Sequence, residues 1–287
     1  MLGSERLRIA VPSKGRLRDS AIEILKGAGL RFRVSGRRLF SVCSDTETRI
    51  IFSNVQDIPV LVAEGVVDLG ITGSDQVREK RVDVIEHHKL GFGQCRVSVA
   101  AHKDGDIREP KDLSGKVVGS SFPNLSSDYF QSEGIEDVHI ISIEGAVEVM
   151  VLLGLVDAIV EIVESGNSLL ENDLVELWPV LGAEAVLIGN QNPRDLAERD
   201  LLLRRIEGVL AARRHSLLEY NCPVDKLEQA TQITPGFSSP TVQKLVDSDW
   251  FAVRVLVERS QVHRILDQLS NLGCVAILES EVRHARL

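Results

Sequence analysis

Apolar and polar positions along residues 7–186 follow two alternating patterns, which together predict an α/β region. Short runs of aliphatic and β-branched residues predict buried strands, while apolar residues at intervals of three or four predict amphipathic helices. Strands that alternate with helices favour mostly parallel sheets. The expected strands cover residues 7–11, 49–53, 67–72, 97–101, 116–119, 138–141 and 158–163, and the expected helices cover residues 17–28, 58–64, 126–133 and 145–153.

The pattern restarts near Phe92 and Gly93 and changes again after Cys222, which predicts more than one domain. Residues 195–219 predict one long helix, of the kind that often joins domains. Beyond it the order is helix, turn, strand, strand, helix, strand, which is typical of a ferredoxin-like α+β fold. We place the boundaries at residues 1–93 with 187–214 for the first lobe, 94–186 for the second lobe, and 215–287 for the C-terminal domain.

Composition excludes several classes of protein. No apolar run approaches the roughly 20 residues that cross a bilayer, and the first residues lack a secretory pattern, so a cytoplasmic protein without membrane contact is expected. A net charge of -9 disfavours nucleic-acid binding, because affinity for a phosphate backbone depends on Lys and Arg. The 4 cysteines are far apart and lack metal-ligand spacing, which favours buried, reduced thiols.

Residues 156–170 carry the most informative chemistry, because a buried strand leads through small polar residues into a helix. Backbone N–H groups at the helix start, with the hydroxyls of Ser165 and Ser168, can surround a phosphate. Gly166 permits close approach of the backbone. Glu161, at the end of the strand, would accept hydrogen bonds from ribose hydroxyls. The same residues could instead simply turn the chain and cap the helix.

Two cations follow the first predicted strand, where open α/β sheets place their ligand-binding loops. Lys14 and Arg16 flank Gly15 and are the main candidates for contacting an anionic ligand, with Arg49 as a further one. Lys14 and Arg16 could also be solvated surface charges, as most Lys and Arg residues are.

Several motifs occur in a fixed order over essentially the whole chain. They lie at residues 11–17 (VPSKGRL), 69–75 (LGITGSD), 90–93 (LGFG), 121–125 (SFPNL), 143–148 (IEGAVE), 157–161 (DAIVE), 233–242 (ITPGFSSPTV) and 273–278 (GCVAIL). As an ordered set they resemble ATP phosphoribosyltransferase of the long form. The resemblance implies two catalytic lobes arranged as in periplasmic binding proteins and a C-terminal ACT-like regulatory domain.

The implied reaction is the first step of histidine biosynthesis, in which N1 of ATP displaces pyrophosphate from phosphoribosyl pyrophosphate with the help of Mg²⁺. Adenine N1 has a free lone pair at neutral pH, so positioning groups matter more than a strong base, and the departing pyrophosphate needs its charge balanced. The resemblance also implies inhibition by histidine and assembly as a homodimer to homohexamer.

The family pattern assigns roles to individual residues. It implies a phosphoribosyl pyrophosphate site at Asp157, Glu161, Glu164, Ser165, Gly166, Asn167 and Ser168; an ATP site at Lys14, Gly15, Arg16, Arg49, Thr72, Gly73 and Asp75; catalytic groups at Lys14, Arg16, Glu148 and Glu161; and a histidine site at Asn221, Phe237, Ser239, Thr241 and Ala276. Some relatives carry Asp where this chain has Asn221, which would attract a cationic amine more strongly.

Simpler roles stay open for several of these residues. Asp75 could be an ordinary helix cap, and Glu144 and Glu148 could be first-turn carboxylates favoured by the helix dipole. Phe237 and Ala276 also fit turn and core positions.

Two other classes of protein compete with the enzyme. A two-lobed small-molecule-binding protein without catalysis would share the lobes, but it predicts export. The effector domain of a transcription regulator would need a helix-turn-helix segment and a basic face, and neither is visible.

Overall fold

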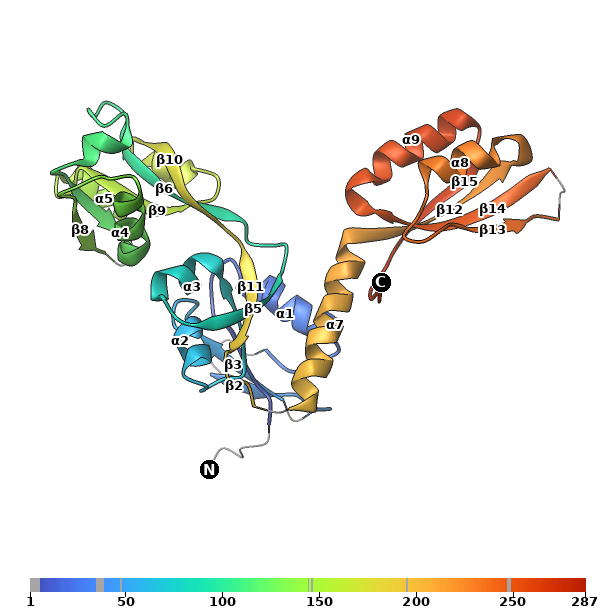
Figure 1. The fold of residues 1–287 in the computed structure, drawn as a ribbon, viewed down its shortest axis with the longest axis horizontal. Helices are drawn as coiled ribbons and strands as arrows, with labels where there is room; N and C mark the ends of the chain where they lie inside the picture. Colours follow the sequence, from blue (N-terminus) through green and yellow to red (C-terminus); the bar gives the residue numbers. More distant parts are fainter. Residues whose placement is uncertain are drawn as a thin grey trace. The chain divides into compact units, whose positions relative to one another are not determined.

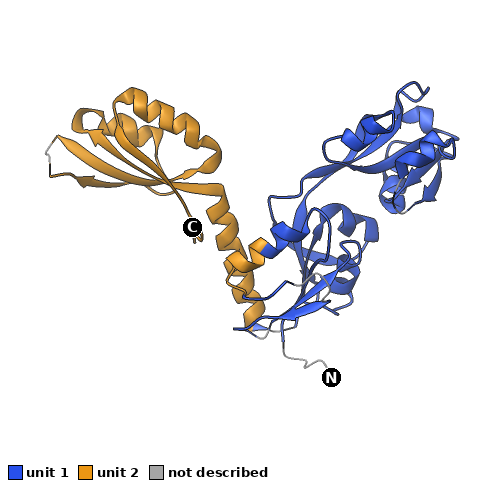
Figure 2. Cartoon of the chain, turned by 180° about the vertical axis from the view of Figure 1, so that it is seen from behind, with its two compact units in different colours: residues 1–22, 31–196 blue, residues 23–30, 197–287 orange. Residues whose placement is uncertain are grey.

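The computed structural model describes residues 6–34, 39–46, 48–143, 145, 147–194, 196–246 and 249–287. Its contacts divide the chain into two compact units, residues 1–22 with 31–196 and residues 23–30 with 197–287 (Figure 2). The first unit contains two sheets, which we call the first and second lobes. The predicted boundaries of three domains stay a prediction.

The first lobe is a 6-stranded sheet in the order β2-β3-β1-β4-β11-β5. Its central strands β1 and β4 are almost wholly buried, which explains why their sequences are mostly apolar or small. Residues Ala10, Ile58, Val62, Val186 and Ile188 belong to one core cluster. The elements are β1 (Arg8–Pro12), α1 (Arg18–Gly27), β2 (Phe40–Val42), β3 (Arg49–Ser53), α2 (Ile58–Ala63), β4 (Leu69–Gly73), α3 (Ser74–Lys80), β5 (Val84–Lys89) and β11 (Ala185–Asn190).

The second lobe is a 5-stranded sheet in the order β10-β6-β9-β7-β8 (Figure 1). Buried side chains form one core cluster that includes Val99, Phe122 and Val160 and another that includes Val147 and Ile159. Neighbouring residues of β9 thus belong to different clusters, as expected for a strand covered on both faces. The elements are β6 (Cys95–His102), η1 (Pro110–Leu113), β7 (Val117–Ser120), α4 (Pro123–Ser132), β8 (His139–Ser142), α5 (Val147–Leu152), β9 (Ala158–Val163), α6 (Asn167–Glu171) and β10 (Leu174–Ala183).

The sheets are mixed, so the expectation of mostly parallel sheets is wrong. Strand β1 runs parallel to β3 and β4, and β7 runs parallel to β8 and β9. However, β11 is antiparallel to β4 and β5, and β6 is antiparallel to β9 and β10. The reason is that the chain crosses between the lobes twice, once between β5 and β6 and once between β10 and β11. These segments hydrogen-bond each other, with Leu90 N donating to Ala185 O at 2.9 Å.

Glu79, near the end of α3, joins the first lobe to the N-terminus of α4 in the second. Its carboxylate accepts hydrogen bonds from Asn124 N at 3.2 Å and Leu125 N at 2.9 Å. Its carbonyl oxygen accepts a third from Asn124 Nδ2 at 2.9 Å. Because a helix N-terminus presents unpaired N–H groups and partial positive charge, this buried carboxylate caps α4 from outside the helix.

The second unit has the predicted ferredoxin-like order, with a 4-stranded antiparallel sheet β13-β14-β12-β15. Helices α8 and α9 cover one face of this sheet (Figure 1). The long predicted helix 195–219 is too long, because α7 ends at Arg214 and alternate residues from Ser216 are buried as part of β12. The elements are α7 (Ala197–Arg214), β12 (His215–Pro223), η2 (Val224–Lys226), α8 (Leu227–Ile233), β13 (Thr241–Lys244), β14 (Trp250–Glu258), η3 (Arg259–Gln261), α9 (Val262–Leu272) and β15 (Val275–Glu281).

The four cysteines are free thiols, as expected. Cys43, Cys222 and Cys274 are buried, whereas Cys95 is only half-buried. Among the described helices, none combines the length and the apolar character that crossing a bilayer requires.

Candidate functional site

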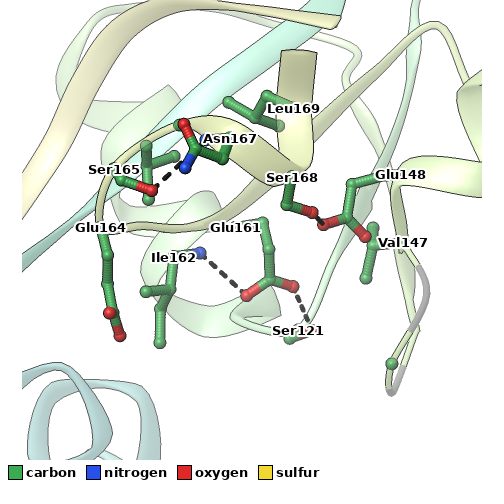
Figure 3. A pocket seen from close by; sticks show the side chains of 13 residues that line it. Ser121, Val147, Glu148, Glu161, Ile162, Glu164, Ser165, Asn167, Ser168 and Leu169 are labelled. Atoms are coloured by element: carbon green, nitrogen blue, oxygen red, sulfur yellow. Dashed lines mark hydrogen bonds between the residues drawn. The ribbon is translucent and has the colours of Figure 1, made fainter. Parts of the chain in front are cut away.

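The loop after β9 forms one wall of a pocket of about 440 Å³ in the second lobe (Figure 3). Six of the seven residues predicted to bind phosphoribosyl pyrophosphate line it, together with Glu148. The lining residues are Ser121, Gly145, Val147, Glu148, Glu161, Ile162, Val163, Glu164, Ser165, Gly166, Asn167, Ser168 and Leu169.

The loop has the local geometry that the sequence predicts. Strand β9 ends at Val163, three residues turn the chain, and α6 begins at Asn167. Gly166 precedes the helix with a φ of 81°, a left-handed conformation that residues with a Cβ rarely adopt. Leu169 is buried and anchors the short helix to the lobe. The turn therefore depends on glycine at residue 166.

Glu161 lines this pocket and is held by two hydrogen bonds. Ser121 Oγ donates to Oε2 at 2.5 Å, and Ile162 N donates to Oε1 at 2.8 Å (Figure 3). Burial raises the pKa of Glu161, and the carboxylates of Glu148 and Asp75 act in the same direction, while the two hydrogen bonds lower it. The side chain is thus fixed in orientation and easier to protonate than an exposed glutamate.

Glu148 and Ser168 contact each other in the lining of the pocket. Glu148 lies in the first turn of α5, and its Oε1 accepts a hydrogen bond from Ser168 Oγ at 2.6 Å. Glu148 therefore lies both in a first helical turn and in the lining of this pocket, and its ligand role stays a prediction. Glu144 lies outside the described residues.

Asp157 is the predicted phosphoribose residue that does not line the pocket. It precedes β9, and its Oδ2 accepts a hydrogen bond from Val117 N at 2.9 Å. Its other oxygen lies 3.6 Å from Lys116 Nζ. These contacts tie the start of β9 to β7.

A second pocket, of about 370 Å³, adjoins the first. Ile162 and Glu164 line both pockets. The second pocket is lined by Lys14, Gly15, Arg16, Leu17, Val55, Gly73, Asp75, Gln76, Ile162 and Glu164. Five of the seven residues predicted for ATP are in this set. Thr72 is buried with its hydroxyl donating to Val55 O at 2.9 Å, and Arg49 belongs to β3 outside the lining.

Arg16 connects the first lobe to the loop that follows β9 in the second lobe. Its Nε lies 3.1 Å from Glu164 Oε1, and its Nη2 donates to Cys95 Sγ at 3.0 Å. A further hydrogen bond goes to Gly93 O, in the segment that crosses between the lobes. Arg16 thus contacts the loop after β9 and the segment between the lobes, and is not an isolated surface charge.

Asp75 is not the cap of α3, because Gly73 occupies the N-cap position. The carboxyl is 1% exposed, and its Oδ1 has no hydrogen-bond partner. Burial raises the pKa of Asp75, although the nearby Arg16 guanidinium lowers it. A Cβ on Gly73 would lie 2.0 Å from Oδ1, so glycine there leaves space for this carboxyl.

The residues predicted for histidine lie in the second unit, but they are spread across the sheet. Asn221 on β12 pairs with Val275, next to Ala276 on β15. Ala276 has a φ of 51° and lies at an irregularity in this pairing. Thr241 lies on β13, at the opposite edge of the sheet from Ala276. Three strand spacings of about 4.8 Å place β13 roughly 14 Å from β15. Phe237 and Ser239 belong to the segment between α8 and β13.

Ser121 is the contact of Glu161 that sequence reasoning did not assign to the site. It directly follows β7, which lies beside β9 in the second sheet. The sequence could have indicated Ser121 as a site residue, because it follows a predicted strand and begins the motif at residues 121–125.

Comparisons with known proteins identify relatives along almost the entire chain. The family model described as ATP phosphoribosyltransferase (HisG) matches residues 54–208, and the model described as the HisG C-terminal domain matches residues 212–284. An ATP phosphoribosyltransferase of Rhodopirellula baltica is 41% identical over 281 residues, covering 98% of this chain and 94% of that protein. One from Corynebacterium glutamicum strain R is 40% identical over 282 residues, covering 98% and 100%.

A solved structure agrees with these sequence matches. It is the ATP phosphoribosyl transferase (HisG:HisZ) complex from Thermotoga maritima, with a TM-score of 0.62 and 27% sequence identity. The match covers 72% of this chain and 98% of that one.

Proposed function

The chain belongs to the ATP phosphoribosyltransferase family, and we propose that it transfers the phosphoribosyl group of phosphoribosyl pyrophosphate to N1 of ATP, releasing pyrophosphate. The main support is the position of residues 161–168, which we call the phosphate loop. Its Ile162 and Glu164 also line the pocket that contains Lys14, Arg16 and Asp75. Two substrates that react with each other require two adjoining sites of this kind.

The first pocket would bind the phosphoribosyl group. Backbone N–H groups at the start of α6 and the hydroxyl of Ser165 surround the 5′-phosphate, where the helix end favours negative charge. Ser168 joins them when its single proton turns from Glu148 to the phosphate. Glu161 accepts hydrogen bonds from the ribose hydroxyls. Its two fixed hydrogen bonds hold the carboxylate in place before the substrate arrives.

The second pocket would bind ATP and bring adenine N1 to the ribose carbon. The lone pair of N1 forms the new bond as the bond to pyrophosphate breaks, so no strong base is needed. Lys14 and Arg16 balance the charge of the departing pyrophosphate.

Mg²⁺ would enter as a complex with the pyrophosphate group. The described residues hold no cluster of three or more His, Cys, Asp or Glu side chains that could form a protein cage for a metal. Mg²⁺ is commonly held by substrate phosphates and only one or two carboxylates, and Glu148 and Glu161, which line the first pocket, are the carboxylates that would hold it. Bound there, the ion supplies positive charge to the leaving group.

We further propose that the enzyme is a cytoplasmic pentosyltransferase of histidine biosynthesis and assembles as a homodimer to homohexamer. Its ferredoxin-like unit would bind histidine as an inhibitor. Asn221 and Ala276 lie near each other and support one site, whereas Thr241 lies at the far edge of the sheet.

One assay tests the proposed activity. Purified protein is mixed with ATP, phosphoribosyl pyrophosphate and Mg²⁺ while the absorbance of the product is followed, and histidine is then added. We expect turnover that histidine inhibits. If folded protein binds the substrates without turnover, the non-enzymatic binding protein replaces the enzyme, and activity that ignores histidine would refute the regulatory role.

A further inference from the structure

Ser121 occupies an unusual place between two acceptors. Its Oγ lies 2.5 Å from Glu161 Oε2 and 3.1 Å from Ile143 O. A serine hydroxyl has a single proton to donate, so it cannot satisfy both acceptors at once while Glu161 is ionised. The shorter distance and the negative charge favour donation to the carboxylate. The hydroxyl therefore determines where this oxygen of Glu161 lies.

The backbone around Ser121 is fixed by a buried group of hydroxyls. Ser120 Oγ donates to Val160 O at 2.8 Å and accepts a hydrogen bond from Phe122 N at 2.9 Å. Ser126 Oγ, in the first turn of α4, lies 2.7 Å from Phe122 O and 3.0 Å from Ser120 Oγ. Val160 directly precedes Glu161, so this group binds the turn to the strand that carries the carboxylate.

We propose that Ser121 is a positioning residue for phosphoribosyl transfer, which orients the Glu161 carboxylate toward the ribose through its hydroxyl. The proposal rests on the proposed function of the pocket. Ser121 lines this pocket together with Glu161, whereas Ser120 and Ser126 are fully buried and do not line it. The hydroxyl of Ser121 thus contacts the carboxylate that is proposed to bind the ligand, whereas the hydroxyls of Ser120 and Ser126 support only the backbone.

The variants Ser121→Ala, Ser121→Thr and Ser126→Ala separate these roles. Ser121→Ala removes the hydrogen bond to Glu161, Ser121→Thr keeps a hydroxyl, and Ser126→Ala removes a buried hydroxyl of the same turn. We expect Ser121→Ala to lower kcat/KM for phosphoribosyl pyrophosphate by about tenfold or more. Ser121→Thr should recover most of this loss, and Ser126→Ala should retain wild-type kinetics while losing thermal stability.

The pH profile gives a readout that a purely structural role would not change. The Ser121 hydrogen bond lowers the pKa of Glu161, whereas Glu148 on α5 and Asp75 on α3 raise it. In Ser121→Ala the hydrogen bond from Ile162 N still lowers the pKa of Glu161, but burial and the two carboxylates are opposed by one hydrogen bond fewer. The ascending limb of kcat/KM against pH should therefore move to higher pH in Ser121→Ala but not in Ser126→Ala.

Three outcomes would overturn the proposal. Wild-type turnover with unchanged kinetics and pH profile in Ser121→Ala would show that this hydroxyl does not position Glu161. Equal defects and equal pH shifts in Ser121→Ala and Ser126→Ala would assign the effect to the fold of the turn. Absence of turnover in the wild-type protein would overturn the proposed function itself, and with it the role of Ser121.

Discussion

Replacing Gly166 by valine tests whether the conformation of the phosphate loop determines affinity for phosphoribosyl pyrophosphate. The residue has a φ of 81°, and an added Cβ would meet only Val163 Cγ1, at 4.0 Å. The cost is therefore conformational and not steric. A left-handed conformation costs a residue with a Cβ about 1–2 kcal/mol, and β-branched residues are true outliers there.

Because of this strain, the loop is expected to leave its conformation and turn its N–H groups away from the phosphate. Restoring that conformation on binding would cost about 1–2 kcal/mol, or roughly a 5- to 30-fold weaker affinity. Isothermal titration calorimetry with phosphoribosyl pyrophosphate measures this change directly.

Gly154→Val is the matched control. Gly154 has a φ of 67°, and a Cβ added there would meet no atom within 4 Å, but the residue lies outside both pockets. Gly154→Val should lose thermal stability and keep its affinity, whereas Gly166→Val should lose affinity, because relaxation of its loop transfers the cost from folding to binding. Equal affinities in the two variants would remove the loop from the phosphate site.

Three further substitutions test other parts of the site. Glu161→Gln should weaken phosphoribosyl pyrophosphate binding about tenfold or more with an unchanged circular dichroism spectrum, and wild-type affinity would contradict its ribose role. Burial raises the pKa of Asp75 in the folded protein above its value in the unfolded chain. Asp75 therefore stabilises the fold most at pH values below the unfolded pKa, and this contribution is lost as pH rises through the folded pKa. Asp75→Asn should therefore raise the Tm at pH about 8 and lose this advantage toward pH about 4, which a pH-independent difference would contradict. Asn221→Asp should lower the histidine concentration needed for half-inhibition, and unchanged sensitivity would exclude this residue from the inhibitor site.

The strand, turn and helix at residues 161–168 could be predicted because these parts are contiguous in sequence. A buried strand, small polar residues and a helix start follow one another from Glu161 to Ser168, so local pattern was sufficient. Ser121 reaches Glu161 through the pairing of β7 with β9, across 40 positions of the chain. Such pairing depends on tertiary packing, which the apolar pattern does not record.

The apolar pattern also could not predict the direction of the strands or the end of one helix. An apolar run such as β11 has the same appearance whether it pairs parallel or antiparallel, so the mixed sheets were not predicted. Around Leu217 apolar residues fit both periodicities. Burial of Leu218, Tyr220 and Cys222 on one face of β12 favoured the strand.

Amide hydrogen exchange at the contact of Glu79 with α4 would report separation of the two lobes. The amide protons of Asn124 and Leu125 are protected by a carboxylate from the other lobe and not by their own helix. Their exchange with solvent therefore requires the lobes to part or the helix end to unfold. A ligand that binds both lobes should slow the exchange of these two amides, whereas a ligand held by one lobe should leave it unchanged.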